Sequence, residues 1–177
     1  KMSCVSSLPS LETARLILRS SVADDAVVYR QLWTERDPRV PPHRQIDSEG
    51  QPTVEVIAEH ILANRHSSGP RLLAVERKST GNVIGYCGLI LGGNGSADEP
   101  ELAYELLRAA HGRGYASEAG SAVLAWAKEA GYHRLWAGVR DWNVASRRVL
   151  VKLGFHETGR VDADALHGNS LLTVREF

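Results

Sequence analysis

The chain has 177 residues, and its 21 basic and 21 acidic side chains leave no formal net charge at pH 7. This length suits one domain over residues 1–177, and a hydrophobic content of 43% argues against disorder. The zero net charge excludes a broadly basic nucleic-acid binder, and no apolar run reaches the ~20 residues of a membrane helix.

The periodicity of apolar residues predicts alternating strands and helices along the whole chain. In chain order, it predicts a strand over Leu11–Arg19, helices over Ala26–Thr34 and Val54–Asn64, strands over Arg71–Arg77, Asn82–Leu91 and Glu101–Leu107, a helix over Ser117–Ala130, a strand over His133–Arg140, a helix over Asn143–Leu153 and a final strand over Leu171–Phe177. Lys78–Gly81 has the composition of a hairpin turn. The order βααβββαβαβ therefore predicts an antiparallel meander inside a mixed sheet, in a single α/β domain.

The turn His111–Ala116, between a predicted strand and a predicted helix, is the sharpest local motif. Its two glycines permit a tight turn, and the N–H groups that begin the next helix favour a pyrophosphate. The alternative is a glycine-rich turn that binds nothing. A dinucleotide fingerprint is disfavoured because Ser117 replaces its third glycine and Asp141 lies well beyond the expected ~20 residues. The turn also follows an antiparallel meander.

Three segments together resemble the GNAT N-acetyltransferases, in particular the ribosomal-protein N-terminal acetyltransferase branch. They are Arg108–Ala119, Asn143–Phe155 and Glu12–Arg19 followed by Asp24–Ala26. The first is similar to the family's acetyl-CoA motif Gln/Arg-x-x-Gly-x-Gly/Ala, with His111 departing at the first position. The resemblance implies a GNAT fold, a mixed and mostly antiparallel central sheet with about four helices on its faces. It also implies acetyl-CoA as cosubstrate and an amine as acceptor.

The resemblance also assigns candidate residues for binding the cosubstrate. These are Leu106, Leu107, His111, Gly112, Arg113, Gly114, Tyr115, Ala116, Ser117, Asn143, Ser146 and Arg147. Asn143 is equally well explained as a helix cap or as a contact to the pantetheine arm. We expect a backbone N–H near Leu106 to meet the developing oxyanion.

Acetyl transfer needs a neutral amine, so a general base is expected. Glu101 and Glu105 lie on one face of their predicted strand, and Glu101 is favoured, although both are also explained as solvated strand residues. Many GNAT enzymes place a proton-donating tyrosine seven residues after the asparagine, where this chain has Leu150. Ser146 is therefore the candidate that protonates, or hydrogen-bonds, the departing sulfur.

Charge and aromatic residues add weaker signals. The segment Arg134 to Lys152 has five basic residues and one acidic residue, a balance that suits binding of the CoA phosphates. All charged residues of the segment Gly92 to Leu107 are acidic, which suits a cationic amine. Chance clustering explains both equally well. Tryptophans 33, 136 and 142 are candidates for an acceptor pocket or for the core. The histidines show no ligand spacing, so no metal is expected.

These observations predict an acetyl-CoA-dependent N-acetyltransferase with direct transfer and no covalent acyl-enzyme, in which Cys87 is a core residue. The alternatives are a non-catalytic acyl-CoA-binding module and a dinucleotide-binding oxidoreductase. The acceptor is left open among a protein N-terminus, a peptide, an aminoglycoside-like compound and a polyamine, with specificity expected in Arg36–Gly50, Gly92–Ala97 and Val161–Asn169.

The start of the sequence and its cysteines bear on the compartment. Residues 1–10 lack the apolar core of a signal peptide, and Cys4 and Cys87 are too few for a disulfide scaffold. We therefore expect a cytoplasmic protein without membrane or nucleic-acid partners. A homodimer is expected by analogy of fold alone.

Overall fold

The computed structural model describes residues 7–67, 69–93 and 95–177. The strands are β1 (Leu11–Glu12), β2 (Leu16–Arg19), β3 (Leu72–Arg77), β4 (Val83–Ile90), β5 (Glu101–Leu106), β6 (Arg134–Arg140), β7 (His156–Asp162) and β8 (Ser170–Glu176). The helices are α1 (Ala26–Glu35), α2 (Val54–Ala63), α3 (Tyr115–Glu129) and α4 (Val144–Lys152), with short 3-10 turns at Ala23–Asp25, Pro42–Arg44 and Arg108–Ala110.

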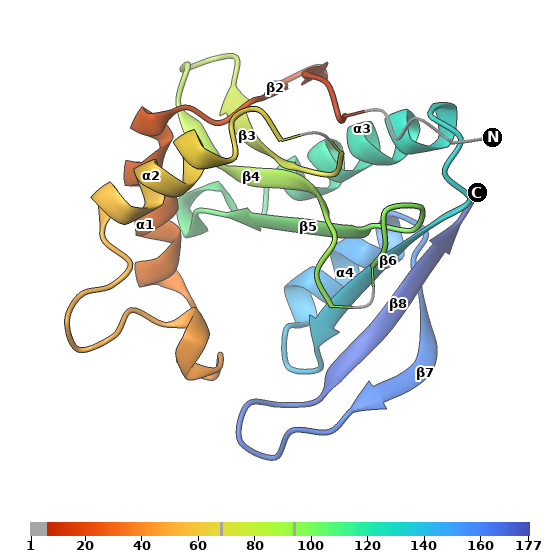
Figure 1. Ribbon diagram of the computed structural model, residues 1–177. Coiled ribbons are helices and arrows are strands. Elements are labelled where there is room, and N and C mark those ends of the chain that lie inside the picture. The colour runs from red at the N-terminus through yellow and green to blue at the C-terminus, as the bar shows by residue number, and fades with distance from the viewer. Residues whose placement is uncertain (1–6, 68, 94) are drawn as a thin grey trace.

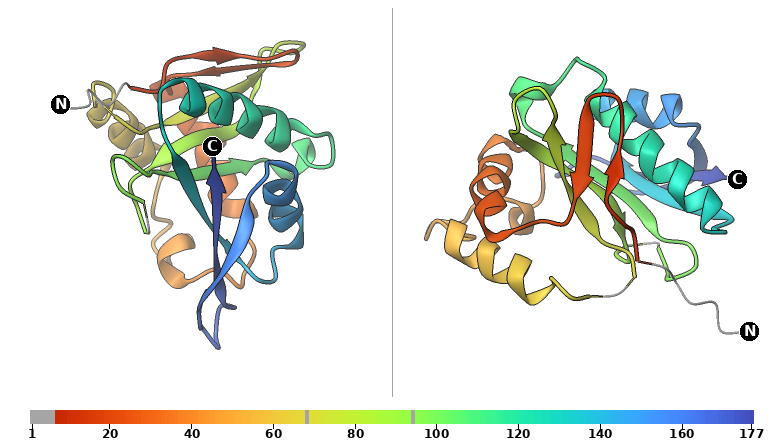
Figure 2. Two further views of the ribbon diagram at one scale, coloured as in Figure 1. Left: turned by 90° about the vertical axis from the view of Figure 1, so that its right-hand side faces the viewer. Right: turned by 90° about the horizontal axis from the view of Figure 1, so that it is seen from above.

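The strands form one eight-stranded sheet in the order β1-β2-β3-β4-β5-β6-β8-β7. Every neighbouring pair is antiparallel except β5 and β6. Helices α1 and α2 lie on one face of the sheet, and α3 and α4 lie on the other (Figures 1 and 2). The mixed, mostly antiparallel sheet with four helices confirms the predicted fold class.

The main core lies between the sheet and the α3–α4 layer. Helix α3 buries Ala119, Val123 and Ala127 on one face, and Ala119 and Val123 belong to the apolar periodicity that predicted the helix. Gly120 brings α3 close to α4, because a Cβ at this position would lie 2.7 Å from a methyl group of Leu153. The two helices are therefore packed together behind the centre of the sheet.

Two features of the sheet differ from the prediction. The expected single strand Leu11–Arg19 is two strands, because the backbone turns where the Thr13 N–H donates to the Leu16 carbonyl at 2.9 Å. Strand β7 was not predicted. All seven of its residues are exposed, so its sequence lacks the alternation that a buried face imposes.

The parallel pair β5–β6 separates almost as soon as it forms. Its register has a single position, Glu101 opposite Trp136, and the two strands then run apart with α4 behind the gap (Figure 1). We call this the β5–β6 divergence, formed by residues 102–106 and 137–140. It interrupts the ladder in the middle of the sheet, where backbone groups would otherwise be paired.

Candidate active site

Glu101 lies at the closed end of the β5–β6 divergence. A backbone hydrogen bond between the two segments runs from the Trp136 N–H to the Pro100 carbonyl at 3.1 Å. The next N–H on β6, that of Gly138, donates instead to Oε1 of Glu101, also at 3.1 Å. The carboxylate thus takes the place of a backbone acceptor where the strands part.

The backbone of β5 presents donors to this gap. The Leu107 N–H donates to the Ile84 carbonyl of β4 at 2.8 Å. Because directions alternate along an antiparallel strand, the N–H groups of Tyr104 and Leu106 point away from β4, toward the divergence. The ring Nε2 of His111 donates to the Leu106 carbonyl at 2.8 Å, so His111 fixes the end of β5 with its side chain.

The predicted phosphate turn connects the end of β5 to α3. Gly112 and Gly114 have φ values of +74° and +80°, in the left-handed region that favours glycine. Gly114 is the N-cap of α3 and supplies no side chain, so the first-turn N–H groups of a 15-residue helix have no side-chain cap from it. These groups and the positive end of the helix dipole can bind an anion.

Residues far away in the sequence brace this turn. Glu118, in the first turn of α3, accepts hydrogen bonds from the Thr13 hydroxyl at 2.5 Å and from Nε of Arg15 at 2.8 Å. The Arg15 guanidinium also lies 4.3 Å from the centre of the Tyr115 ring. Burial raises the pKa of Glu118, but these hydrogen bonds outweigh it and lower the pKa below its usual value.

Helix α4 supplies the other predicted residues. Oδ1 of Asn143 accepts the Ser146 N–H at 3.2 Å, so this oxygen caps the helix. Ser146 Oγ shares a hydrogen bond of 2.9 Å with Oη of Tyr104, which also donates to the Ser146 carbonyl at 3.2 Å. Leu150, at the family's tyrosine position, is 3% exposed and belongs to the core.

Tyr104 is a site residue that the sequence did not identify. Its phenol is partly buried, and burial raises its pKa to about 12, so it stays protonated at neutral pH. Strand alternation places it on the opposite face of β5 from Glu101 and Glu105. The two predicted catalytic residues, Glu101 and Ser146, therefore approach the β5–β6 divergence from opposite faces of the sheet.

Glu105 forms an ion pair with Arg36. Its two carboxylate oxygens accept from Nε and an Nη of Arg36, both at 3.0 Å, and Tyr86 Oη donates to it at 2.7 Å. Burial lowers the pKa of Arg36, but the bonds to Glu105 outweigh burial and raise it above its usual value. Glu105 is thus a paired carboxylate, and Glu101, which accepts the Gly138 N–H, stays the preferred candidate base on this strand.

The expected separation of charge is partly cancelled by ion pairs. Three of the five basic residues in the segment Arg134 to Lys152 have carboxylate partners, namely Arg134 with Glu99 at 3.1 Å, Arg140 with Asp164 at 3.4 Å and Arg147 with Glu157 at 2.7 Å. Arg147 also donates to the Asp141 carbonyl in the β6–α4 connection, so its guanidinium links that connection to Glu157 of β7. The charge imbalance of the two segments in the sequence is therefore partly compensated by ion pairs in the fold, some with residues outside the segments.

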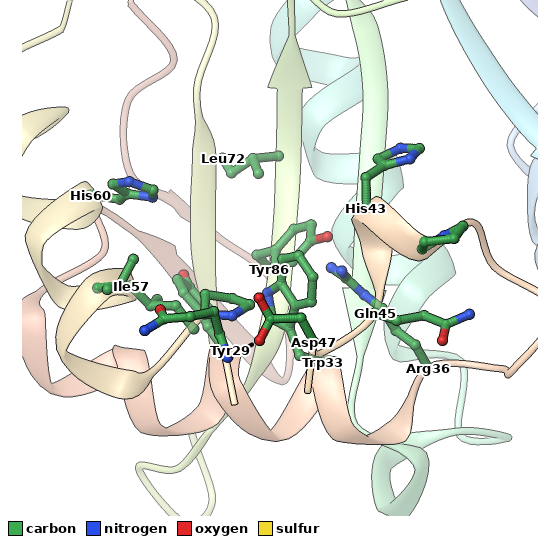
Figure 3. Close-up of a pocket in the computed structure, with 14 residues that line it drawn as sticks. Tyr29, Trp33, Arg36, His43, Gln45, Asp47, Ile57, His60, Leu72 and Tyr86 are labelled. Atoms are coloured by element: carbon green, nitrogen blue, oxygen red, sulfur yellow. Dashed lines mark hydrogen bonds between the residues drawn. The ribbon is translucent and has the colours of Figure 1, made fainter. Parts of the chain in front are cut away.

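A cavity of about 600 Å³ lies on the α1–α2 face of the sheet (Figure 3). Its walls come from α1, α2, β3, β4 and the α1–α2 connection, and the residues are Tyr29, Trp33, Arg36, Pro42, His43, Gln45, Asp47, Gln51, Pro52, Val56, Ile57, His60, Leu72 and Tyr86. Arg36 and Tyr86 both contact Glu105, so the inner end of the cavity lies against β5.

The α1–α2 connection also reaches the other side of the divergence. The Arg39 guanidinium lies 4.3 Å from the centre of the Trp142 ring. Trp142 Nε1 donates to the His167 carbonyl at 2.7 Å in the β7–β8 connection. Two of the three segments expected to set specificity therefore meet at Trp142. In the third, Gly92–Ala97, Asn94 lies outside the described residues, as does Cys4.

The described part of the chain has neither a candidate metal cluster nor a candidate membrane helix. In residues 7–67, 69–93 and 95–177, no group of three or more histidine, cysteine, aspartate or glutamate side chains is arranged to hold a metal ion. In the same residues, no helix has the length and apolarity needed to cross a membrane.

The glycine turn at the N-terminus of α3, next to a divided parallel pair of strands, suits the binding of a phosphorylated ligand. Comparison with known proteins identifies the family: residues 15–156 match the acetyltransferase (GNAT) domain. The chain belongs to this family.

Individual relatives agree with this assignment. The uncharacterised N-acetyltransferase p20 of Bacillus licheniformis is 32% identical over 163 residues, which cover 86% of this chain and 85% of the relative. An acetyltransferase structure from Agrobacterium tumefaciens is 28% identical with a TM-score of 0.73, covering 97% of this chain and 96% of that one. RimJ of Mycobacterium smegmatis, in complex with CoA-disulfide, is 22% identical with a TM-score of 0.73, covering 91% and 81%. At this identity the likeness shows the fold alone, so the ribosomal-protein branch stays a prediction.

Proposed function

We propose that the protein is an acetyl-CoA-dependent N-acetyltransferase that moves the acetyl group directly to a primary amine. The observation that carries the proposal is that the glycine turn at the N-terminus of α3 directly follows β5, which forms one side of the β5–β6 divergence. The turn offers N–H groups to a pyrophosphate, and the divergence offers N–H groups to an extended arm. Together they suit a long cosubstrate with phosphates at one end and a reactive group at the other.

The proposed cosubstrate contacts follow the placement of the residues. His111 to Ser117 hold the pyrophosphate through the backbone, and Leu106 and Leu107 lie beside the arm. The amide nitrogen of Asn143 is directed to the arm while its oxygen caps α4. Arg147 contacts the cosubstrate from the side of β7, where its guanidinium is paired with Glu157.

In the proposed reaction, the amine nitrogen attacks the thioester carbonyl and the C–S bond then breaks. Glu101 first accepts one proton of the ammonium, directly or through water, which allows the nitrogen to attack, and the Leu106 N–H stabilises the oxyanion. As the C–S bond breaks, the nitrogen loses a second proton, which passes to solvent or to the departing thiolate. Ser146, held in one rotamer by Tyr104, donates a hydrogen bond to the thiolate as CoA leaves. Hydrogen-bond donors placed where negative charge develops stabilise the transition state of such a reaction.

Direct transfer is supported by the state of Cys87. It is fully buried, and burial raises the pKa of its thiol to about 12, so it presents no thiolate at neutral pH. Among the described residues, no other cysteine competes for the role of nucleophile. The proposal therefore involves a ternary complex of enzyme, acetyl-CoA and amine.

The test is a thiol-release assay with acetyl-CoA and a panel of amines, combined with mass spectrometry of the intact protein. We expect CoA release that depends on an amine, and no acetylated protein after incubation with acetyl-CoA alone. Acetyl-CoA binding without release for any amine would favour a non-catalytic module. Thermal stabilisation by NADH and not by acetyl-CoA would contradict the proposal and favour a dinucleotide-binding enzyme. Homodimerisation stays a prediction.

A further inference from the structure

Apolar side chains from three directions line the cavity on the α1–α2 face. Tyr29 and Trp33 come from α1, Ile57 from α2, and Leu72 and Tyr86 from the sheet (Figure 3). The rings of Tyr29 and Tyr86 meet edge to face, with centroids 5.8 Å apart and planes at 88°. The cavity volume of about 600 Å³ lies within the range of pockets that hold small organic molecules.

The hydroxyl groups of the two tyrosines already have hydrogen-bond partners. The Tyr29 hydroxyl shares a hydrogen bond of 2.5 Å with Ser21, and the Tyr86 hydroxyl donates to Glu105 at 2.7 Å. The Arg36 guanidinium stacks 3.9 Å from the Trp33 ring centre while pairing with Glu105. The tyrosine rings therefore offer apolar surface to an occupant, and their hydroxyl groups are already engaged.

The charges at the cavity do not suit a second ammonium group. Glu105, behind its inner end, is neutralised by Arg36 and lies 3.9 Å from Arg44. Among the described residues that line the cavity, Asp47 supplies the only carboxylate, and its Oδ1 accepts the N–H groups of Glu49 and Gln51. A desolvated ammonium needs a carboxylate partner, so a polycation would be poorly bound here.

Resting on the proposed function, we infer that the acceptor is a primary amine that carries one apolar, ring-sized body and no second cationic centre. The body lies between Trp33, Tyr86 and Leu72, and the amine points along the Tyr86–Glu105 edge toward the β5–β6 divergence. Such an amine is either a free arylalkylamine or the first residue of a peptide with an aromatic N-terminus. Both share the chemistry that the cavity recognises.

The test compares four acceptors in the thiol-release assay, namely phenethylamine, a phenylalanine-initiated peptide, an alanine-initiated peptide and spermidine. We expect kcat/KM to be at least about tenfold higher for one of the two aromatic acceptors, a difference of ~1.4 kcal/mol. Comparison of phenethylamine with the phenylalanine-initiated peptide shows whether the aromatic ring belongs to a free amine or to a peptide N-terminus. A higher kcat/KM for spermidine or for the alanine-initiated peptide would overturn the inference and leave the proposed function intact.

Two variants probe the cavity itself. Trp33→Ala should raise the KM of the preferred aromatic acceptor about tenfold and leave the KM of acetyl-CoA unchanged. Val56→Asp adds a carboxylate to the lining, so it should raise kcat/KM for spermidine and lower it for the aromatic acceptor. Val27→Ala is the control, because Val27 is 63% exposed on the same helix as Trp33 and does not line the cavity.

Calorimetry without an acetyl donor separates this inference from the proposed function. Phenethylamine or the phenylalanine-initiated peptide should bind the protein saturated with CoA, and Trp33→Ala should weaken that binding. Binding of this kind without any CoA release would count against the proposed function and support the inference. Absence of binding by both aromatic compounds would overturn the inference, whether or not the protein releases CoA with another amine.

Discussion

Replacing Gly114 by alanine tests whether the backbone of the turn holds the cosubstrate. Gly114 has a φ of +80°, and a Cβ there would meet Nη2 of Arg15 at 3.5 Å, an ordinary contact. The methyl group therefore fits, and the cost is that of a left-handed residue, about 1–2 kcal/mol. For a domain of this size, we expect the melting temperature to fall by roughly 2–8 °C.

The same change should weaken CoA binding. If the backbone relaxes to a negative φ, at least one first-turn N–H turns away from the pyrophosphate. A hydrogen bond to a charged group contributes about 1.5–3 kcal/mol, so the Kd for CoA should rise about tenfold or more. Isothermal titration calorimetry at fixed ionic strength measures this directly.

Gly131 provides a matched control at the other end of α3. Its φ is +93°, and a Cβ there would have no heavy atom within 4 Å. Gly131→Ala should therefore cost similar stability and leave the Kd for CoA unchanged. Equal Kd values for the two variants and the wild type, at similar losses of stability, would refute the role of the turn.

Four further substitutions test the candidate catalytic residues, the Tyr104 hydroxyl and Glu118 at the glycine turn. Ser146→Ala should lower kcat about a hundredfold and Tyr104→Phe about fivefold, with CoA affinity unchanged. If Tyr104 acts through Ser146, the double variant should be no slower than Ser146→Ala, and a slower double variant would contradict this role of Tyr104. Glu101→Gln keeps an acceptor for the Gly138 N–H but removes the base, so kcat/KM should fall about a hundredfold at pH 7. The deficit should shrink as the pH approaches the pKa of the acceptor amine, about 8 for a peptide N-terminus and about 10 for an alkylamine. A deficit independent of pH would exclude Glu101 as the base. The pKa of Glu118 is lowered on folding, so its contribution to stability is present above the usual carboxyl pKa of about 4.3 and lost as the pH falls through the folded value. Glu118→Gln should therefore destabilise the protein from pH 6 to 8 and matter progressively less below pH 4, as measured by urea unfolding; a constant difference over this range would show that the ionised carboxylate contributes nothing.

The sequence predicted those elements that bury one face against the core. Helix α3 and strands β3 to β5 show the expected periodicity because their apolar residues pack on the sheet or under it. Strand β7 is exposed on every residue, so no pattern marks it. The division between β1 and β2 depends on Thr13 and Arg15, whose partner Glu118 is more than a hundred residues away.

The candidate site was predictable where its geometry is local. The left-handed turn at Gly112 and Gly114 needs glycine, and glycine is visible in the sequence. The contact between Tyr104 and Ser146 joins residues 42 apart, and no local rule places the tyrosine opposite α4. Likewise, the partner of Glu105 is an arginine 69 residues before it, so the two carboxylates of β5 could not be distinguished by sequence alone.

The stacking of Arg39 on Trp142 has a consequence for engineering this protein. It joins the α1–α2 connection to the β6–α4 connection, and Trp142 in turn bonds the β7–β8 connection. A Cβ on Gly168 would lie 2.4 Å from the Trp142 ring, so the backbone of that connection fits closely around the indole. Replacing one of these connections by that of a relative would remove one partner of a contact and leave the other partner in place without it. Exchanges intended to alter acceptor choice should therefore move all three connections as one unit, together with the tryptophan between them.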